Sequence, residues 1–178
     1  EQSRGLPVKV ADLSQAIDIQ TGLAATCAIL QSQVVECWGS NGNGFLVPGR
    51  TDVSLLGPTV VPRMVAMEIG MGNSHQCARL MDGTVGCWGK NDKGQLGAGD
   101  LDVHGAPVVA RGLSQVSQLA VDGDRACVCR TDAPVACWGD GFGSVPIVPS
   151  SEAVKVSAVA VGPDFLCVVG EAGDVSCW

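Results

Sequence analysis

Cysteines are the residues of this chain best suited to chemistry, and eight of the nine are set in pairs ten residues apart. The pairs are Cys27 and Cys37, Cys77 and Cys87, Cys127 and Cys137, and Cys167 and Cys177. Paired zinc ligands usually stand only two to four residues apart, and the chain has only two histidines, His75 and His104. The spacing favours structural disulfides over reduced core cysteines and over a metal site. Disulfides would place the chain in an oxidising compartment.

Other polar residues form no catalytic pattern. His75 lies near Ser74 and Asp82 in sequence, but the repeats described below explain each of them separately. Asp100 and Asp102 lack the dense D-x-D-x-D-G frame of a calcium loop, which favours solvated turn carboxylates. We therefore expect no catalytic residues, no metal and no cofactor, and we expect that the chain is not an enzyme.

Each cysteine pair belongs to a longer repeat. A tryptophan follows the second cysteine of every pair: Trp38, Trp88, Trp138 and Trp178. The first three tryptophans are 50 residues apart and the fourth follows after 40, because the link after Trp138, GDGFGSVPIVP, is shorter. A Pro-Val segment and a short alternating apolar stretch, such as AIDI or AMEI, precede each cysteine frame. These four copies predict a repeat array of short strands.

The cysteine frame itself predicts a β-hairpin. In the second copy, a three-residue loop Met81-Asp82-Gly83 places Gly83 in a left-handed position and sets Cys77 opposite Cys87. Opposed residues on antiparallel strands have Cβ atoms about 4.5–5.5 Å apart, which a disulfide can span. The same register joins the cysteines of the other copies, so that each bridge closes its own hairpin.

The tryptophan one residue later points to the opposite face of the strand. We expect all four tryptophans to pack between neighbouring sheets, in preference to the alternative of stacking on sugars or bases. Cys129 has no counterpart in the other units. It lies on the same strand face as Cys127 and is expected to be an unpaired, buried thiol, with linkage to a partner as the alternative.

Composition narrows the possible partners. The formal net charge of the 178 residues is −7, and no basic patch is present to neutralise phosphates, which argues against nucleic acid. No apolar run reaches the roughly 18 residues of a membrane span. The first ten residues, EQSRGLPVKV, contain no apolar core of a signal peptide, so we expect that one is absent or has been removed.

The segment GNSHQCARLMDGTVGCWGKNDKGQLG, residues 72–97, closely resembles the repeat of the regulator of chromosome condensation family. The matching residues are Gly72, His75, Ala78, Leu80, Asp82, Gly83, Trp88, Gly89, Asn91, Gly94, Gln95, Leu96 and Gly97. The other copies match more loosely. The additional Cys-x9-Cys-Trp pattern is similar to exported members of this broad family and to the ectodomains of crinkly-type plant receptor kinases.

This resemblance implies an all-β fold of propeller blades, each of about four antiparallel strands. We expect four blades, at about residues 7–40, 58–90, 107–140 and 146–178, with glycine-rich links between them. The family usually has seven blades, so an open arc or part of a larger propeller is favoured over a closed ring of four.

The resulting functional hypothesis is a non-enzymatic module at the cell surface or outside the cell, with a structural or protein-interaction role. The alternative is a nucleotide-exchange regulator of a small GTPase, as in the nuclear member of the family. No polar cap is visible on the first or last unit. We therefore expect a protein partner, further propeller blades or another copy of the chain to pack against the end blades.

Overall fold

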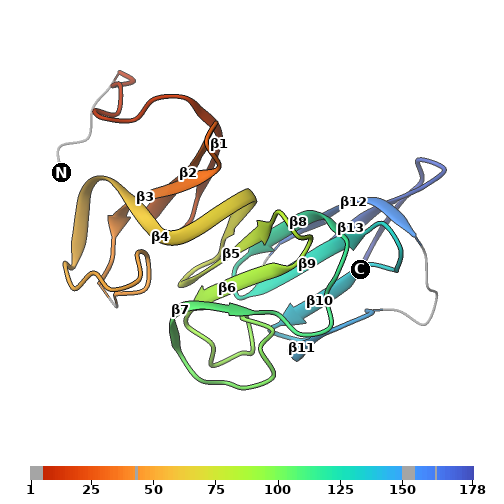
Figure 1. Ribbon diagram of the computed structural model, residues 1–178. Helices are drawn as coiled ribbons and strands as arrows, with labels where there is room; N and C mark the ends of the chain where they lie inside the picture. The colour runs from red at the N-terminus through yellow and green to blue at the C-terminus, as the bar shows by residue number, and fades with distance from the viewer. Residues whose placement is uncertain (1–5, 43, 150–154, 163) are drawn as a thin grey trace.

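The computed structural model describes residues 6–42, 44–149, 155–162 and 164–178, and in these ranges the chain forms fourteen strands and no helix (Figure 1). The strands are β1 (Ala16–Thr21), β2 (Ala25–Leu30), β3 (Val34–Ser40), β4 (Ser54–Met71), β5 (His75–Leu80), β6 (Val85–Gly89), β7 (His104–Val109), β8 (Val116–Asp122), β9 (Arg125–Arg130), β10 (Ala136–Gly139), β11 (Gly143–Ile147), β12 (Val156–Val161), β13 (Leu166–Gly170) and β14 (Val175–Cys177). All of the pairings are antiparallel, and the fold is the expected all-β arrangement of propeller blades.

Four blades follow one another along the chain. The first contains β1, β2, β3 and the beginning of β4, and the second contains the end of β4 with β5, β6 and β7. The long strand β4 serves both blades because it turns at Arg63, whose φ is 58°. The third blade contains β8 to β11, and the fourth contains β12, β13 and β14.

The central hairpins have the predicted register. Cys77 pairs with Cys87 and Arg79 with Val85, and the backbone N–H of Leu80 donates to the carbonyl of Thr84 at 2.9 Å. Gly83 has a φ of 77°, which glycine adopts without the steric cost that a Cβ would add. The loop chemistry read from the sequence therefore sets this strand pairing.

The outermost strands differ from the expected unit boundaries. Pro58, Pro107 and Pro146 were expected near the start of the second, third and fourth units, but each lies in the outermost strand of the preceding blade. Proline lacks a backbone N–H and is tolerated on an edge strand, where only one side is paired. Boundaries at residues 58, 107 and 146 therefore cut through a strand and do not separate the blades.

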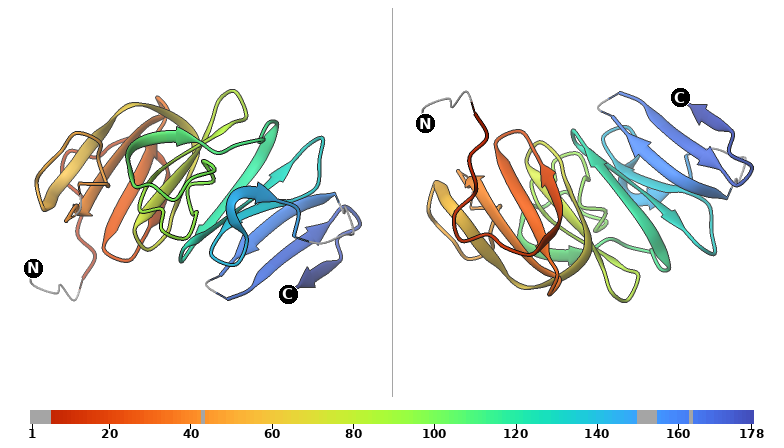
Figure 2. Two further views of the ribbon diagram at one scale, coloured as in Figure 1. Left: turned by 90° about the horizontal axis from the view of Figure 1, so that it is seen from below. Right: turned by 90° about the horizontal axis from the view of Figure 1, so that it is seen from above.

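Successive blades pack face to face around three hydrophobic clusters, one at each junction. Both views of Figure 2 show an open arc, in which the first and fourth blades lie at opposite ends.

The innermost strands of all four blades contribute to a cavity of about 260 Å³, lined in part by Gln20, Glu68, Ala120 and Ala160. For each blade, the face toward the preceding blade is called the leading face below, and the opposite one the trailing face.

Candidate functional site

All four cysteine pairs are disulfide-bonded in the structure. Each bridge joins directly opposed residues with a Cα–Cα distance of 4.1 Å. The bridges lie on the trailing faces: Cys27 and Cys37 of the first blade, for example, share a core with Ile69 and Trp88 of the second. The first three bridges are fully buried, whereas Cys177 of the fourth is exposed. Each bridge therefore stabilises a hairpin, and the first three also supply apolar surface for the next blade.

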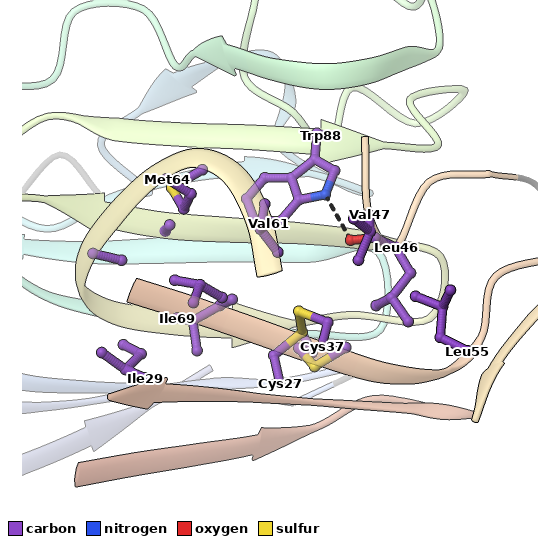
Figure 3. Packing of buried hydrophobic residues seen from close by; sticks show 14 residues of the cluster. Cys27, Ile29, Cys37, Leu46, Val47, Leu55, Val61, Met64, Ile69 and Trp88 are labelled. Atoms are coloured by element: carbon purple, nitrogen blue, oxygen red, sulfur yellow. Dashed lines mark hydrogen bonds between the residues drawn. A yellow bond between two sulfur atoms is a disulfide. The ribbon is translucent and has the colours of Figure 1, made fainter. Parts of the chain in front are cut away.

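Two tryptophans hold a turn of the preceding blade. Trp88 and Trp138 are fully buried. Trp88 Nε1 donates to the carbonyl of Leu46 at 3.4 Å (Figure 3), and Trp138 Nε1 donates to the carbonyl of Gln95 at 2.9 Å. A buried indole N–H needs an acceptor, and in both cases the acceptor comes from the link that follows the preceding tryptophan.

An asparagine gives each of these links its shape. Asn41 Oδ1 accepts from the backbone N–H of Leu46 at 2.8 Å, and Asn91 Oδ1 accepts from that of Leu96 at 2.9 Å. The buried amide of Asn91 also donates to the carbonyl of Asp100 at 3.0 Å. The sequence Asn-x-x-Gly-x-Leu is thus a preformed turn that presents a carbonyl and a leucine to the next blade. We call it the docking turn.

Trp178 does not have the packing role predicted for it, because its side chain is 49% exposed. Its own blade packs on the third, whose link at Gly139–Ile147 contains no Asn-x-x-Gly-x-Leu sequence. Trp38 is also only partly buried, and no docking turn lies against it in the described part of the chain. Burial of this tryptophan therefore depends on a docking turn from the neighbouring blade.

Within the described ranges, no segment covers the trailing face of the fourth blade. The valine two positions before the second cysteine is buried in the first three blades, as Val35, Val85 and Val135. Its counterpart Val175 is 65% exposed. An apolar position that is buried in the first three blades is therefore open to solvent in the fourth blade.

The leading face of the first blade is likewise not covered by any described residue. Ile69, Leu119 and Val159 lie at equivalent positions of the inner strands and pack against the preceding blade. Ile69 is 1% exposed, whereas its counterpart Ile19 in β1 is 55% exposed. The two ends of the arc are thus the two halves of an ordinary blade junction, each without its partner.

Hydrogen bonds between the inner strands strengthen two junctions. Glu68 Oε2 accepts from the backbone N–H of Leu119 at 2.9 Å and from Arg79 Nε at 3.0 Å. Gln118 Oε1 accepts from the backbone N–H of Val159, also at 2.9 Å. Sequence reasoning missed these residues, although the 50-residue interval between Glu68 and Gln118 was a signal that could have found them.

Cys129 is a buried free thiol at the junction of the third and fourth blades. Its sulfur lies 3.6 Å from Gln118 Oε1. Burial, with a smaller effect from the charge of Glu68, raises the pKa of Cys129 to about 11. The thiolate is the reactive form of cysteine, so this side chain is protonated and unreactive near neutral pH.

His75 is completely buried and packs over Gly72, where a Cβ would overlap the imidazole ring. Neither ring nitrogen has a hydrogen-bond partner among the residues that the structure describes, and burial lowers the pKa of His75 to about 4. Phe165 lies over Gly162 in the same way in the fourth blade. The ring at this position therefore acts in packing.

The remaining candidate residues have local roles. Asp82 Oδ1 accepts from the backbone N–H of Thr84 and from its hydroxyl, at 2.9 and 2.6 Å, inside the hairpin loop. Asp100 Oδ1 lies 3.1 Å from His104 Nε2 and accepts from the backbone N–H of Asp102. Nowhere in the described ranges do three His, Cys, Asp or Glu side chains group as metal ligands, and no helix there could span a membrane.

A family model for the regulator of chromosome condensation (RCC1) repeat matches residues 82–129. No curated protein sequence matches the chain. Human WBSCR16 superposes with a TM-score of 0.81 at 19% identity, over 92% of this chain and 46% of its own. Yeast RCC1 (Prp20), in its complex with Kap60, gives a TM-score of 0.77 at 20% identity, over 97% and 46%.

A third similar structure is the CRINKLY WD40 ectodomain of the Arabidopsis thaliana receptor kinase ACR4. Its TM-score is 0.57 at 20% identity, over 92% of this chain and 49% of that one. The chain thus spans about half the length of each of these three solved structures. Residues 82–129 are therefore similar to an RCC1 repeat, and the chain has the fold of a partial, open propeller of RCC1 type.

Proposed function

We propose that this chain is an extracellular, non-enzymatic protein-interaction module, built from disulfide-bonded RCC1-type blades. The observation that carries the proposal is the set of four bridges, one in each hairpin. Disulfides persist in oxidising compartments and are rare in the cytosol and nucleus. The likeness to a receptor kinase ectodomain supports the same location.

The interaction role is supported by the two ends of the arc. Ile19 on the first blade and Val175 on the fourth are exposed at positions that the internal junctions bury. An apolar position that every internal junction buries, left exposed at an end of the arc, favours a contact with another protein. Because the surface repeats the chemistry of a blade junction, it favours a protein partner over a small-molecule substrate.

The competing candidate is a nucleotide-exchange-type regulator that acts on a small GTPase inside the cell. The likeness to yeast RCC1 favours it. The two candidates differ in the state of the cysteines, because four hairpin bridges would not persist in a reducing compartment.

Counting thiols separates the two candidates. Cells that produce the protein naturally are treated, together with their medium, with an alkylating agent, and the alkyl groups on the denatured protein are counted by mass spectrometry. We expect one alkylated residue, Cys129, none in Cys129→Ser, and nine after prior reduction. Nine alkylated cysteines without reduction would overturn the extracellular assignment.

A further inference from the structure

A depression of about 210 Å³ lies between the first and second blades. It is bordered by the turn between β1 and β2, by the docking turn at residues 41–46 and by the turn between β4 and β5. Its buried lining includes Leu46, Met71 and Gln76, and its exposed lining includes Leu23. We call it the Gln76 pocket. Both blades that form it are present, so the pocket does not depend on either end of the arc.

Gln76 carries a buried hydrogen-bond acceptor without a partner. The residue is only 6% exposed, and none of the described residues donates to its Oε1. It lies directly opposite Trp88 in the hairpin, so both side chains are on the leading face of the second blade. A buried carbonyl that is left unpaired costs free energy, and a ligand that donates to it would remove this cost.

The second junction has the reverse arrangement. There the glutamine belongs to the docking turn: Gln95 is fully buried, and its Oε1 accepts from a backbone N–H of the same turn at 2.8 Å. The strand residue opposite Trp138 is the small Ala126. At the first junction the turn carries the half-buried Phe45 and the strand carries the glutamine. The amide is therefore satisfied at the second junction, whereas at the first junction its carbonyl faces no donor.

The size and the lining of the Gln76 pocket define what it can bind. Pockets for drug-sized ligands usually have volumes of about 300–1,000 Å³, so a volume of about 210 Å³ suits a single side chain. Its described lining residues include no Asp, Glu, Lys, Arg or His, so an ionised group would find no opposite charge. Asn41 is already engaged, because it bonds to the backbone of Leu46 and Asp52. The buried part of the pocket therefore offers apolar surface and one free acceptor.

A tyrosine side chain matches this combination. Its ring is apolar, and its single hydroxyl group can donate to a buried acceptor. Tyrosine is also among the residues that most often anchor protein interfaces by filling a pocket. Tryptophan offers a donor as well, but the smaller phenol ring suits the volume better.

We propose that the Gln76 pocket binds a tyrosine side chain of a partner protein. This inference rests on the proposed function and deepens it, because it names the group by which the partner is recognised. The phenol O–H donates to Gln76 Oε1, and the ring packs against Leu46, Met71 and Phe45. Leu23 contacts the partner at the mouth of the pocket.

The test titrates N-acetyltyrosinamide into the full ¹⁵N-labelled chain and follows the side-chain amide signals of Gln76 by NMR. These signals are identified by their loss in Gln76→Met. We expect them to shift saturably, with a millimolar Kd. N-acetylphenylalaninamide lacks only the hydroxyl group and should bind about fivefold to tenfold more weakly, because Gln76 Oε1 then stays unpaired.

Matched variants make the result specific. Gln76→Met removes the acceptor but keeps the length of the side chain, and it should abolish the preference for tyrosine, judged from backbone shifts around the pocket. Gln76→Ala introduces the residue that the third blade has at this position and should have the same effect. Leu23→Ser should weaken the binding of both amides. Leu101→Ser changes another exposed leucine, outside the pocket, and should leave both affinities unchanged.

The proposal is overturned if the Gln76 signals do not move at millimolar N-acetyltyrosinamide, or if the two amides bind the wild-type chain equally well. It also fails if Gln76→Met retains the preference for tyrosine. Displacement of N-acetyltyrosinamide by methyl glucoside would show that the occupant is a sugar and would overturn it too. The thiol count does not depend on this titration, so failure of the tyrosine proposal is distinguishable from failure of the extracellular assignment.

Discussion

The same residue type has different surroundings at equivalent positions of the four blades. Trp88 and Trp138 are buried beneath a docking turn, whereas Trp38 and Trp178 are not. The difference does not lie in the strand that carries the tryptophan, since the hairpin register is the same in each blade. The difference lies in the link of the neighbouring blade. Burial of the tryptophan therefore shows that a docking turn is present at its junction.

His75 gives a prediction at this scale. Its pKa is about 4 in the folded chain and about 6.5 when unfolded, so between these pH values the unfolded state binds more protons. Stability is therefore full above pH 6.5 and falls as the pH falls toward 4. The loss is on the order of 3 kcal/mol, from about 1.4 kcal/mol per pKa unit. His75→Phe, which introduces the ring that Phe165 provides at the equivalent position, should remove this part of the acid dependence.

Urea unfolding of the wild-type chain and of His75→Phe, at pH 7.5 and 4.5, measures this effect. His104→Asn changes the other histidine of the chain and should retain the wild-type acid dependence. Equal loss of stability in the wild-type chain and in His75→Phe would contradict the assignment to His75.

At the scale of the strands, the hairpin bridges should differ in their contributions. Loop entropy gives each bridge about 2–3 kcal/mol. Removing the buried Cys77–Cys87 bridge by double substitution with Ala also leaves a cavity in the junction core, which adds roughly 1–2 kcal/mol. The second cysteine of the Cys167–Cys177 bridge is exposed. Removing this bridge should therefore lower the free energy of unfolding by the loop-entropy contribution alone.

Thermal unfolding followed by circular dichroism compares the two double variants. We expect a folded protein in both cases, with the lower Tm in the variant that lacks Cys77 and Cys87. Complete unfolding of that variant at room temperature would show that the blades cannot fold without their bridges. Equal Tm values would show that burial of the bridge adds nothing.

The sequence predicted the hairpins well because their pairing is decided locally. Only one hairpin register brings both cysteines together. It follows from the ten-residue spacing, from a loop glycine such as Gly83, and from the alternation of side chains between the two faces of a strand. The outer strands were assigned to the wrong blade because the segments around Pro107 and Pro146 are apolar and extended in either arrangement. Their partner strand is chosen by the packing of the whole blade, which no local pattern records.

The whole arc gives a prediction about association. Two uncovered junction faces should make the isolated chain associate weakly and in a concentration-dependent way, with Val175 of one copy near Ile19 of another. Val175→Lys places a charge in that contact and should reduce association, with little effect on stability because the residue is largely exposed. Sedimentation velocity over a hundredfold range of concentration measures both proteins.

A single monomeric species over the whole range would show that neither end face is adhesive on its own. Unchanged association in Val175→Lys would place the contact elsewhere on the surface.

The candidate site was only partly predictable at this scale. Asn91 and Leu96 were visible as part of a family repeat, but not their function as a turn that docks on the next blade. That function depends on a contact between residues more than 40 positions apart, such as Leu46 and Trp88. Exposure of a face on each end blade could be expected from the number of repeats alone. The residues on those faces could be identified only from the structure.

Equivalence of the junctions has a consequence for how such chains change in length. The trailing face of one blade and the leading face of the next use the same set of positions, 50 residues apart in the first three units. Loss or gain of one complete unit, by recombination between the copies, joins two faces that already fit. Insertions and deletions of whole blades are therefore the length changes that this architecture accepts most readily, because they create no new kind of interface.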